Sequence, residues 1–184
     1  MVTIGLDISS SKVGIAVLDS DENIILSEVI KFKTNTTLEV RALKFERRMR
    51  EIEKAYVPLD IFIEQPAMMF KGGKTTAQTM AKLQRFNGMC SYVVYKIFDI
   101  LPILINPRSA RSKLSIKIPR GQKPKKIIIE WVENRYKEQF EYNITRHGNP
   151  QPGTDDRADA IIVALGGTRL AVSYTHLTLP TILR

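Results

Sequence analysis

Val2-Thr3-Ile4-Gly5-Leu6-Asp7-Ile8 is the stretch of sequence from which the fold can be worked out. Its apolar residues predict a strand buried on both faces. Asp7 is the exception, because aspartate is depleted in strands and an unpaired carboxylate is costly to bury. Two further apolar runs follow at 13–18 and 24–32, separated by short polar turns. These hairpin-like spacings predict three neighbouring antiparallel strands.

The rest of the chain alternates between helical and extended patterns. In chain order, hydrophobic spacing and proline positions predict a helix over 38–56, a strand over 59–64, a helix over 75–98 and a strand over 101–105. Three later helices are predicted: one from Pro107 behind the capping residue Asn106, one over 124–137, and one from the capping residue Thr154 to Gly166-Gly167. The order predicts an α/β fold with a mixed five-stranded sheet, its first three strands antiparallel, and helices on both faces.

Composition limits the class of protein. The 184 residues are enough for one domain, which we expect to span 1–172. The formal net charge is +9, which favours a polyanionic partner, and no apolar run approaches the length of a membrane span. A single cysteine, Cys90, precludes an intrachain disulfide and fits the cytoplasm of a bacterium or an infected host cell. Residues 173–184 differ in character from the rest and are interpreted as a non-native or disordered tail.

Four acidic residues stand in mostly apolar surroundings: Asp7, Glu64, Asp156 and Asp159. Carboxylates gathered from strands and a helix repel one another unless a hard divalent cation neutralises them. Asp156 has a competing explanation, since an acid in the first turn after Thr154 favours the helix dipole. Asp159 lies deeper in the helix, where capping explains it poorly. The set predicts an oxygen-ligand metal site.

A long basic segment lies between Asp99 and Glu130, where the sequence contains no acid. Its cations, which we predict to contact nucleic-acid phosphates, are Arg108, Arg111, Lys113, Lys117, Arg120, Lys123, Lys125 and Lys126. Lys71 and Lys74, in a glycine-containing loop, are predicted to add contacts. Phe70 in the same loop could stack on an exposed base or pack beneath the loop.

The order and spacing of these acids resemble those of the RuvC-type Holliday junction resolvases of the RNase H-like superfamily, and of their bacteriophage members in particular. The resemblance rests on Ile4-Gly5-Leu6-Asp7-Ile8-Ser9-Ser10-Ser11, on Ile63-Glu64-Gln65-Pro66, and on the Asp156-x-x-Asp159 pair that opens an apolar helix. It covers roughly residues 1–171. Members carry an aromatic residue shortly after the strand-four glutamate, whereas this chain has Pro66-Ala67 there and Phe70 a little later.

The resemblance implies a homodimer that binds a four-way DNA junction and cuts it by two symmetric nicks. It implies Mg²⁺ or Mn²⁺ at the carboxylates. From the chemistry of phosphodiester hydrolysis we predict two ions per site, with Asp7 bridging them, Glu64 and Asp159 each holding one, and Asp156 binding metal or positioning water. An apolar edge of the helix at 75–98, with Ala81, Met89 and Val93, is a candidate dimer seam.

Three other functions stay open on sequence alone. A related nuclease could act on RNA, flaps or forks. The Asp7-x-Ser9-Ser10-Ser11-x-x-Gly14 pattern also resembles the phosphate loop of actin-like ATPases, although those proteins repeat the fold twice. The chain could also be a non-catalytic DNA-binding module, which the presence of all four acids disfavours.

Overall fold

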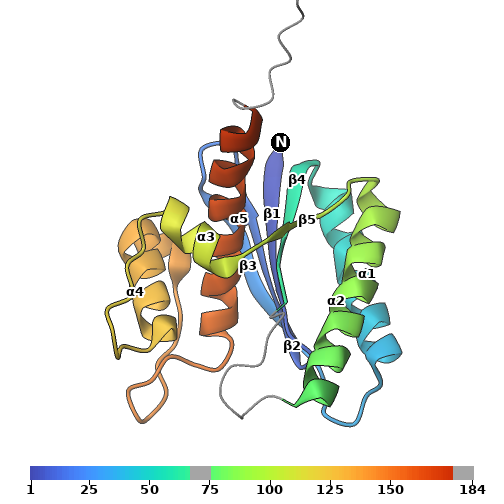
Figure 1. Cartoon of the computed structure of the whole chain (residues 1–184), viewed down its shortest axis with the longest axis horizontal. Coiled ribbons are helices and arrows are strands. Elements are labelled where there is room, and N and C mark those ends of the chain that lie inside the picture. The colour runs from blue at the N-terminus through green and yellow to red at the C-terminus, as the bar shows by residue number, and fades with distance from the viewer. Residues whose placement is uncertain (67–75, 176–184) are drawn as a thin grey trace, which may run out of the picture.

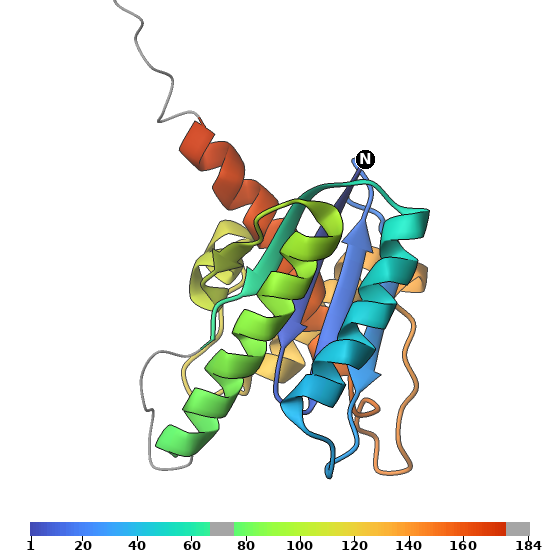
Figure 2. The same cartoon turned by 90° about the vertical axis from the view of Figure 1, so that its right-hand side faces the viewer.

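The sheet has the predicted mixed topology. The structure, a computed structural model, describes residues 1–66 and 76–175, and within them five strands form one sheet in the order β3-β2-β1-β4-β5 (Figures 1 and 2). The strands are β1 (Val2–Ile8), β2 (Lys12–Leu18), β3 (Ile24–Lys31), β4 (Pro58–Glu64) and β5 (Ile103–Ile105). β1 to β3 pair antiparallel, and β4 and β5 run parallel to β1.

Helices cover both faces of this sheet, as predicted (Figure 1). The helices are α1 (Leu38–Ala55), α2 (Ala77–Phe98), α3 (Pro107–Lys113), α4 (Pro124–Tyr136), the short 3-10 helix η1 (Lys137–Phe140) and α5 (Thr154–Thr175). α1 and α2 pack on one face and the later helices on the other, which makes a three-layer α/β/α arrangement. Within the described part of the chain, none of these helices is long and apolar enough to span a membrane.

Successive side chains along each strand point to opposite faces of the sheet, and this alternation determines which residues face α5. In β1, Ile4, Leu6 and Ile8 join the core beneath α1 and α2. The intervening residues Gly5 and Asp7 therefore point to the opposite face, where α5 lies. In β4, Phe62 belongs to the core beneath α5, so Glu64, two residues later, points to that face as well.

Two glycines in the sheet let α5 approach it closely. A Cβ atom at Gly5 would lie 2.2 Å from the backbone oxygen of Ala160, and one at Gly14 would lie 2.0 Å from the backbone oxygen of Asp156. Both contacts are with helix backbone, so any larger residue would push the helix away. The glycines thus hold the first turns of α5 against β1 and β2.

The end of α5 differs from the prediction. The helix continues past Gly166-Gly167 to Thr175, through the start of the segment assigned to a tail. A Cβ atom at Gly166 would lie 2.5 Å from the Cβ atom of Ala110, and one at Gly167 would lie 2.3 Å from the ring of Phe62. The pair therefore serves close packing inside the helix and does not end it. The remaining tail residues, 176–184, lie outside the described residues.

Of the two predicted capping residues, Asn106 caps its helix and Thr154 does not. Asn106 caps α3 as predicted, because its side-chain oxygen accepts a 2.9 Å hydrogen bond from the backbone N–H of Arg108. Thr154 was predicted to cap α5, but it is the first helical residue. Its hydroxyl donates a 2.9 Å hydrogen bond to the carbonyl of Gln151 instead of accepting one from the helix.

The dimer seam predicted on α2 is not a free surface. Val93 is buried in the core with the sheet, and Met89 packs against that core. The helix turns these two residues inward, because the buried stripe of α2 also includes Phe86 and Cys90. Of the three predicted residues, only Ala81 is exposed.

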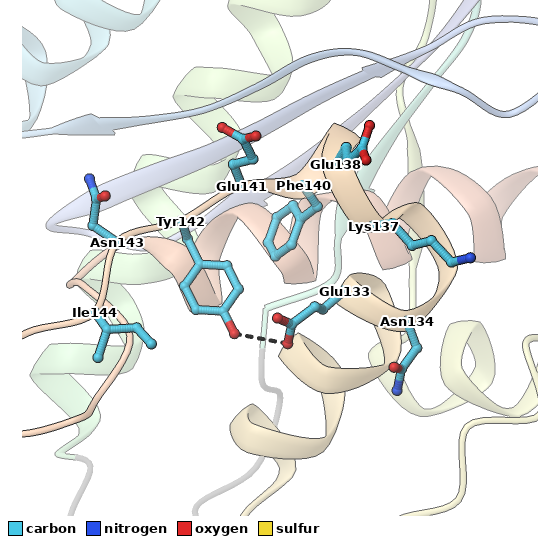
Figure 3. Close-up of a pocket in the computed structure, with 9 residues that line it drawn as sticks. All are labelled: Glu133, Asn134, Lys137, Glu138, Phe140, Glu141, Tyr142, Asn143 and Ile144. Atoms are coloured by element: carbon cyan, nitrogen blue, oxygen red, sulfur yellow. Dashed lines mark hydrogen bonds between the residues drawn. The ribbon is translucent and has the colours of Figure 1, made fainter.

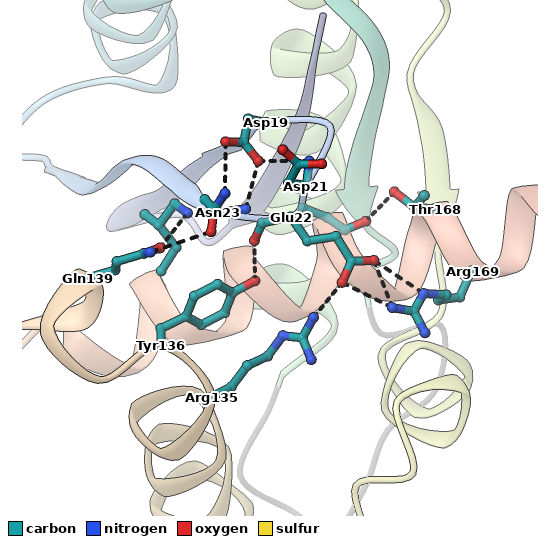
Figure 4. A network of polar contacts seen from close by, with 11 residues as sticks. Asp19, Asp21, Glu22, Asn23, Arg135, Tyr136, Gln139, Thr168 and Arg169 are labelled. Atoms are coloured by element: carbon teal, nitrogen blue, oxygen red, sulfur yellow. Dashed lines mark hydrogen bonds and ion pairs between the residues drawn. The ribbon is translucent and has the colours of Figure 1, made fainter.

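A group of hydrogen bonds and ion pairs joins the turn between β2 and β3 to α4 and α5 (Figure 4). The carboxylate of Glu22 accepts hydrogen bonds from Arg135 of α4 and, at 2.7 Å, from Arg169 of α5. Its backbone carbonyl accepts a 2.8 Å hydrogen bond from the hydroxyl of Tyr136. The turn, α4 and α5 are therefore held together by one acidic residue.

Candidate active site

Asp7 and Glu64 come from neighbouring parallel strands. The register pairs Leu6 of β1 with Ile63 of β4, so Asp7 and Glu64 follow one residue later on each strand. Both side chains point to the α5 face, and parallel strands end at a common edge of the sheet. The side-chain amide of Asn87 on α2 also donates a 3.4 Å hydrogen bond to the backbone carbonyl of Glu64. The strand end that carries Glu64 is thus held from the other face.

The first turns of α5 bring the other two acids to this edge. Across the β1–β2 pair, Asp7 lies opposite Gly14, and Gly14 lies against the backbone of Asp156. Asp159 is three residues further along, so it shares a helix face with Asp156. The structure therefore gathers all four predicted acids at one end of the sheet.

Mutual repulsion and burial shape the ionisation of three of them. Burial raises the pKa of Asp7 well above its ordinary value, and the charges of Glu64 and Asp159 add to the effect. Burial and the charge of Asp159 raise the pKa of Glu64 to about 7. Burial raises the pKa of Asp159 to about 6, although the charge of Arg111 opposes the rise. The three carboxylates lie close enough to act on one another.

These three carboxylates also have no neutralising partner within hydrogen-bonding range. Among the described residues, none donates a hydrogen bond to the side chain of Asp7, Glu64 or Asp159, and none forms an ion pair with it. Arg111 of α3 acts on Glu64 and Asp159 electrostatically without forming such a pair. Asp7, Glu64 and Asp159 therefore form an acidic cluster that has no direct ion-pair partner among the described residues.

Asp156 differs, because a lysine neutralises it. The Lys12 ammonium group at the start of β2 donates a hydrogen bond to the Asp156 carboxylate and lies 3.9 Å from Asp155. Lys125 pairs with Asp155, and that hydrogen bond lowers the pKa of Asp155 to about 2 against the opposing effect of burial. Lys12 is not among the site residues predicted from the sequence. Its place in the turn between Asp7 and Gly14 was the available signal.

The donor set fits a hard divalent cation. All four side chains offer only oxygen atoms, the ligands that Mg²⁺ and Mn²⁺ accept, and among the described residues none forms an ion pair with the half-buried Asp7, Glu64 or Asp159. In the part of the chain that the structure describes, no three acidic, histidine or cysteine side chains converge closely enough to form a ready-made metal site. The fit to a divalent cation therefore rests on the chemistry of the donor atoms.

The predicted basic residues divide between two cavities. Arg108, Arg111 and Lys117 line one of about 460 Å³. Lys123, Lys125 and Lys126 line another of about 690 Å³, which reaches Asp155. Lys113 lies on α3, and Arg120 is exposed in the connection before α4. Phe70, Lys71 and Lys74 lie outside the described residues, so their predicted contacts stay predictions.

A further cavity of about 810 Å³ lies around η1, away from the acids (Figure 3). Its lining includes Glu133, Glu138 and Glu141, so it is unsuited to a polyanion. Within it the hydroxyl of Tyr142 donates a 2.9 Å hydrogen bond to Glu133, which fixes the ring at the cavity wall. None of the four site acids lines this cavity.

The fold is shared with solved structures of junction resolvases. RuvC of Thermus thermophilus in complex with a Holliday junction substrate has a TM-score of 0.69 and 16% sequence identity, over 95% of this chain and 97% of that chain. This chain has an RNase H-like fold. A second structure of Thermus thermophilus RuvC has a TM-score of 0.66 and 17% identity, over 95% and 98% of the two chains.

A eukaryotic resolvase is also similar. The yeast mitochondrial Holliday junction resolvase Ydc2 has a TM-score of 0.59 and 15% identity, over 95% of this chain and 80% of that chain. No protein-family model matches the sequence, and no curated protein is significantly similar to it. The likeness to RuvC-type resolvases is therefore one of structure, at an identity that establishes the fold alone.

Proposed function

We propose that this protein is a divalent-metal-dependent endonuclease that resolves four-way DNA junctions by paired symmetric nicks. The observation that carries the proposal is the meeting of Asp7, Glu64 and Asp159 at one end of the sheet without a neutralising partner among the described residues. A net charge of +9 and the similarity in fold to resolvases that act on Holliday junctions support a branched DNA substrate.

The acids would divide the work of phosphodiester hydrolysis. Asp7, Glu64 and Asp159 would hold Mg²⁺ or Mn²⁺, and Asp156 would join them once the DNA or the metal displaces Lys12. When bound, two such ions activate water and stabilise the charge that develops on the phosphoryl and leaving oxygens. Because the pKa values of Glu64 and Asp159 are raised, both side chains are partly protonated near neutral pH until a cation favours their charged forms.

We also propose that the protein is a homodimer, through a surface other than the predicted seam. Four large exposed side chains lie on α2 and on the β5 segment that follows it: Tyr92 and Tyr95 on α2, Leu101 before β5, and Leu104 within β5. We call these four residues the edge patch. Exposed apolar clusters of this kind mark interaction surfaces, and a two-fold dimer would offer two identical sites to a junction with matching symmetry.

A panel of labelled substrates tests the proposed activity. The wild-type protein should nick four-way junctions in Mg²⁺ at symmetric positions and be inactive with chelator. Asp7→Asn should abolish nicking and leave junction binding within a few-fold of wild type, because it removes a metal ligand and not a DNA contact. The panel also contains flaps, forks, duplex DNA and DNA–RNA hybrids.

The outcomes separate the possible functions. If the protein prefers a flap, a fork or a hybrid, the proposed active site stands and the proposed substrate changes. Binding without metal-dependent nicking of any substrate would indicate a non-catalytic DNA-binding module. Mg²⁺-dependent nicking by purified Asp7→Asn protein at the wild-type rate would contradict the assignment of the site.

A further inference from the structure

The basic segment does not present a uniform positive surface. Lys125 is paired with Asp155, and Lys126 lies 3.6 Å from Glu130, so the cavity at the start of α4 combines lysines with acids. Glu133 also lines that cavity. Acidic residues of the protein itself largely compensate the positive charge of these lysines, which weakens their attraction for an external anion.

The cavity beside α3 has the opposite character. Its lining consists of three cationic side chains, two hydroxyl side chains and two isoleucines: Arg108, Arg111, Lys117, Ser112, Ser115, Ile116 and Ile118. No acidic residue lines it. Among the described residues, none forms an ion pair with Arg108, Arg111 or Lys117. Three cations without a direct ion-pair partner among the described residues repel one another across the cavity, and an anion inside it would relieve that repulsion.

From this geometry we infer that the α3 cavity, defined by Arg108, Arg111, Ser112, Ser115 and Lys117, binds one backbone phosphate of the DNA strand that is cut. This phosphate would lie next to the one positioned at the acids. The inference rests on the proposed nuclease function and adds a specific binding position to it.

Arg111 provides the link between the cavity and the acids. It lines the cavity, and its helix begins two residues after Ile105, which pairs with Glu64 across β4 and β5. The helix that carries Arg111 therefore starts at the strand ends where Glu64 lies. A strand whose phosphate sits in the cavity would continue toward the acids, and this contact would set which bond is presented for cleavage.

The hydroxyl side chains suit a phosphate better than a carboxylate partner. A phosphate offers several acceptor oxygens, arginine binds it in a bidentate manner, and serine hydroxyls can donate to the oxygens that remain. The backbone at the cavity is fixed by the end of α3, where the N–H of Ile116 donates a 2.9 Å hydrogen bond to the carbonyl of Arg111. The lining residues are thus presented by an ordered turn.

The first test compares two double variants that remove the same charge. Arg108→Gln/Lys117→Gln removes two cavity cations, whereas Arg47→Gln/Lys54→Gln removes two exposed cations from α1 on the other face of the sheet. Junction binding is measured with chelator by fluorescence anisotropy over a range of salt concentrations. We expect the cavity variant to bind at least about tenfold more weakly and its salt slope to fall by about two, with a much smaller change in the control.

The second test locates the phosphate. Single methylphosphonate linkages, which are neutral, are placed in turn around the cleavage position of the junction. In the wild type, one linkage beside the scissile phosphate should weaken binding several-fold. In Arg108→Gln/Lys117→Gln the same linkage should have little further effect, because the interaction has already been removed. A competition experiment adds inorganic phosphate to the wild-type complex with the junction. Displacement of the junction at millimolar phosphate would show that the cavity accepts a free phosphate too.

The results distinguish this inference from the proposed function. Equal affinities and salt slopes for the cavity and control variants would overturn the phosphate position even if the wild-type protein cleaves junctions. Additive losses at every methylphosphonate position would overturn it too. Conversely, a selective, non-additive loss would support the position even if no nicking were found.

Discussion

At the scale of single residues, the acids of the site could be predicted but their partners could not. Asp7 stands out because a buried strand rarely contains aspartate, and Glu64 because it ends an apolar strand. Local sequence thus indicated both side chains. The pairing of Lys12 with Asp156 joins residues 144 positions apart, and the closeness of Lys12 to Asp7 in the sequence does not show which acid it pairs with. The fold alone determines which acid is neutralised.

The raised pKa of Glu64 predicts a pH-dependent stability. The pKa is about 7 in the folded protein and about 4.5 ordinarily, so between these values the native state keeps a proton that the unfolded state releases. The free energy of unfolding should therefore fall as the pH rises through this window and stay lower above it. Glu64→Gln should be more stable than wild type by about 3 kcal/mol at pH 8 in chelator and nearly equal to it at pH 4.

Urea unfolding at the two pH values measures this difference, and saturating Mg²⁺ should reduce it by stabilising only the wild type. A wild-type protein as stable as Glu64→Gln at pH 8 without metal would show that Glu64 is not held in a repulsive, buried environment.

At the scale of elements, short-range signals predicted where helices and strands lie, and packing decided how far they extend. Asn106-Pro107 was sufficient to place the start of α3. Gly166-Gly167 was misread as a helix end, because the sequence does not show that Ala110 and Phe62 press against it. The position of α5 is set in the same non-local way by Gly5 and Gly14.

Gly14→Ala tests whether the approach of α5 to the sheet positions the acids. The added Cβ atom would lie 2.0 Å from a backbone oxygen of the helix, so α5 must shift. We expect the free energy of unfolding to fall by about 1–3 kcal/mol and junction nicking to be largely lost. Gly88→Ala is the matched control, because nothing lies within 4 Å of its added atom, and it should be neutral or stabilising by up to about 1 kcal/mol. Wild-type nicking by Gly14→Ala would show that the site does not depend on this contact.

At the scale of the whole molecule, the mixed five-stranded sheet, its three antiparallel first strands and the helices on both faces all followed from the sequence. They did so because hairpin spacings, a crossover helix and alternating hydrophobicity restrict an α/β chain to few topologies. The association of chains was harder to predict. Periodicity identified an apolar edge on α2 without showing that Met89 and Val93 turn into the core, or that Leu101 and Leu104 remain outside it.

The edge patch predicts the oligomeric state. Sedimentation equilibrium at micromolar concentration should give the mass of two chains for the wild type and of one chain, 20.9 kDa, for Tyr92→Glu/Leu101→Glu. Both side chains are exposed, so their replacement should leave the folded monomer intact. Leu43→Glu on the exposed side of α1 is the control and should remain dimeric. A monomeric wild type would rule out the dimer, and a dimeric edge-patch variant would move the interface elsewhere.

The central claim is that the acids at the end of the sheet capture divalent cations, and crystals soaked in Mn²⁺ test it most directly. An anomalous difference map should show manganese within about 2.5 Å of carboxylate oxygens of Asp7, Glu64 and Asp159, and no such peak in Asp7→Asn crystals. Manganese bound only elsewhere, or an empty acidic end of the sheet at saturating Mn²⁺, would contradict the account.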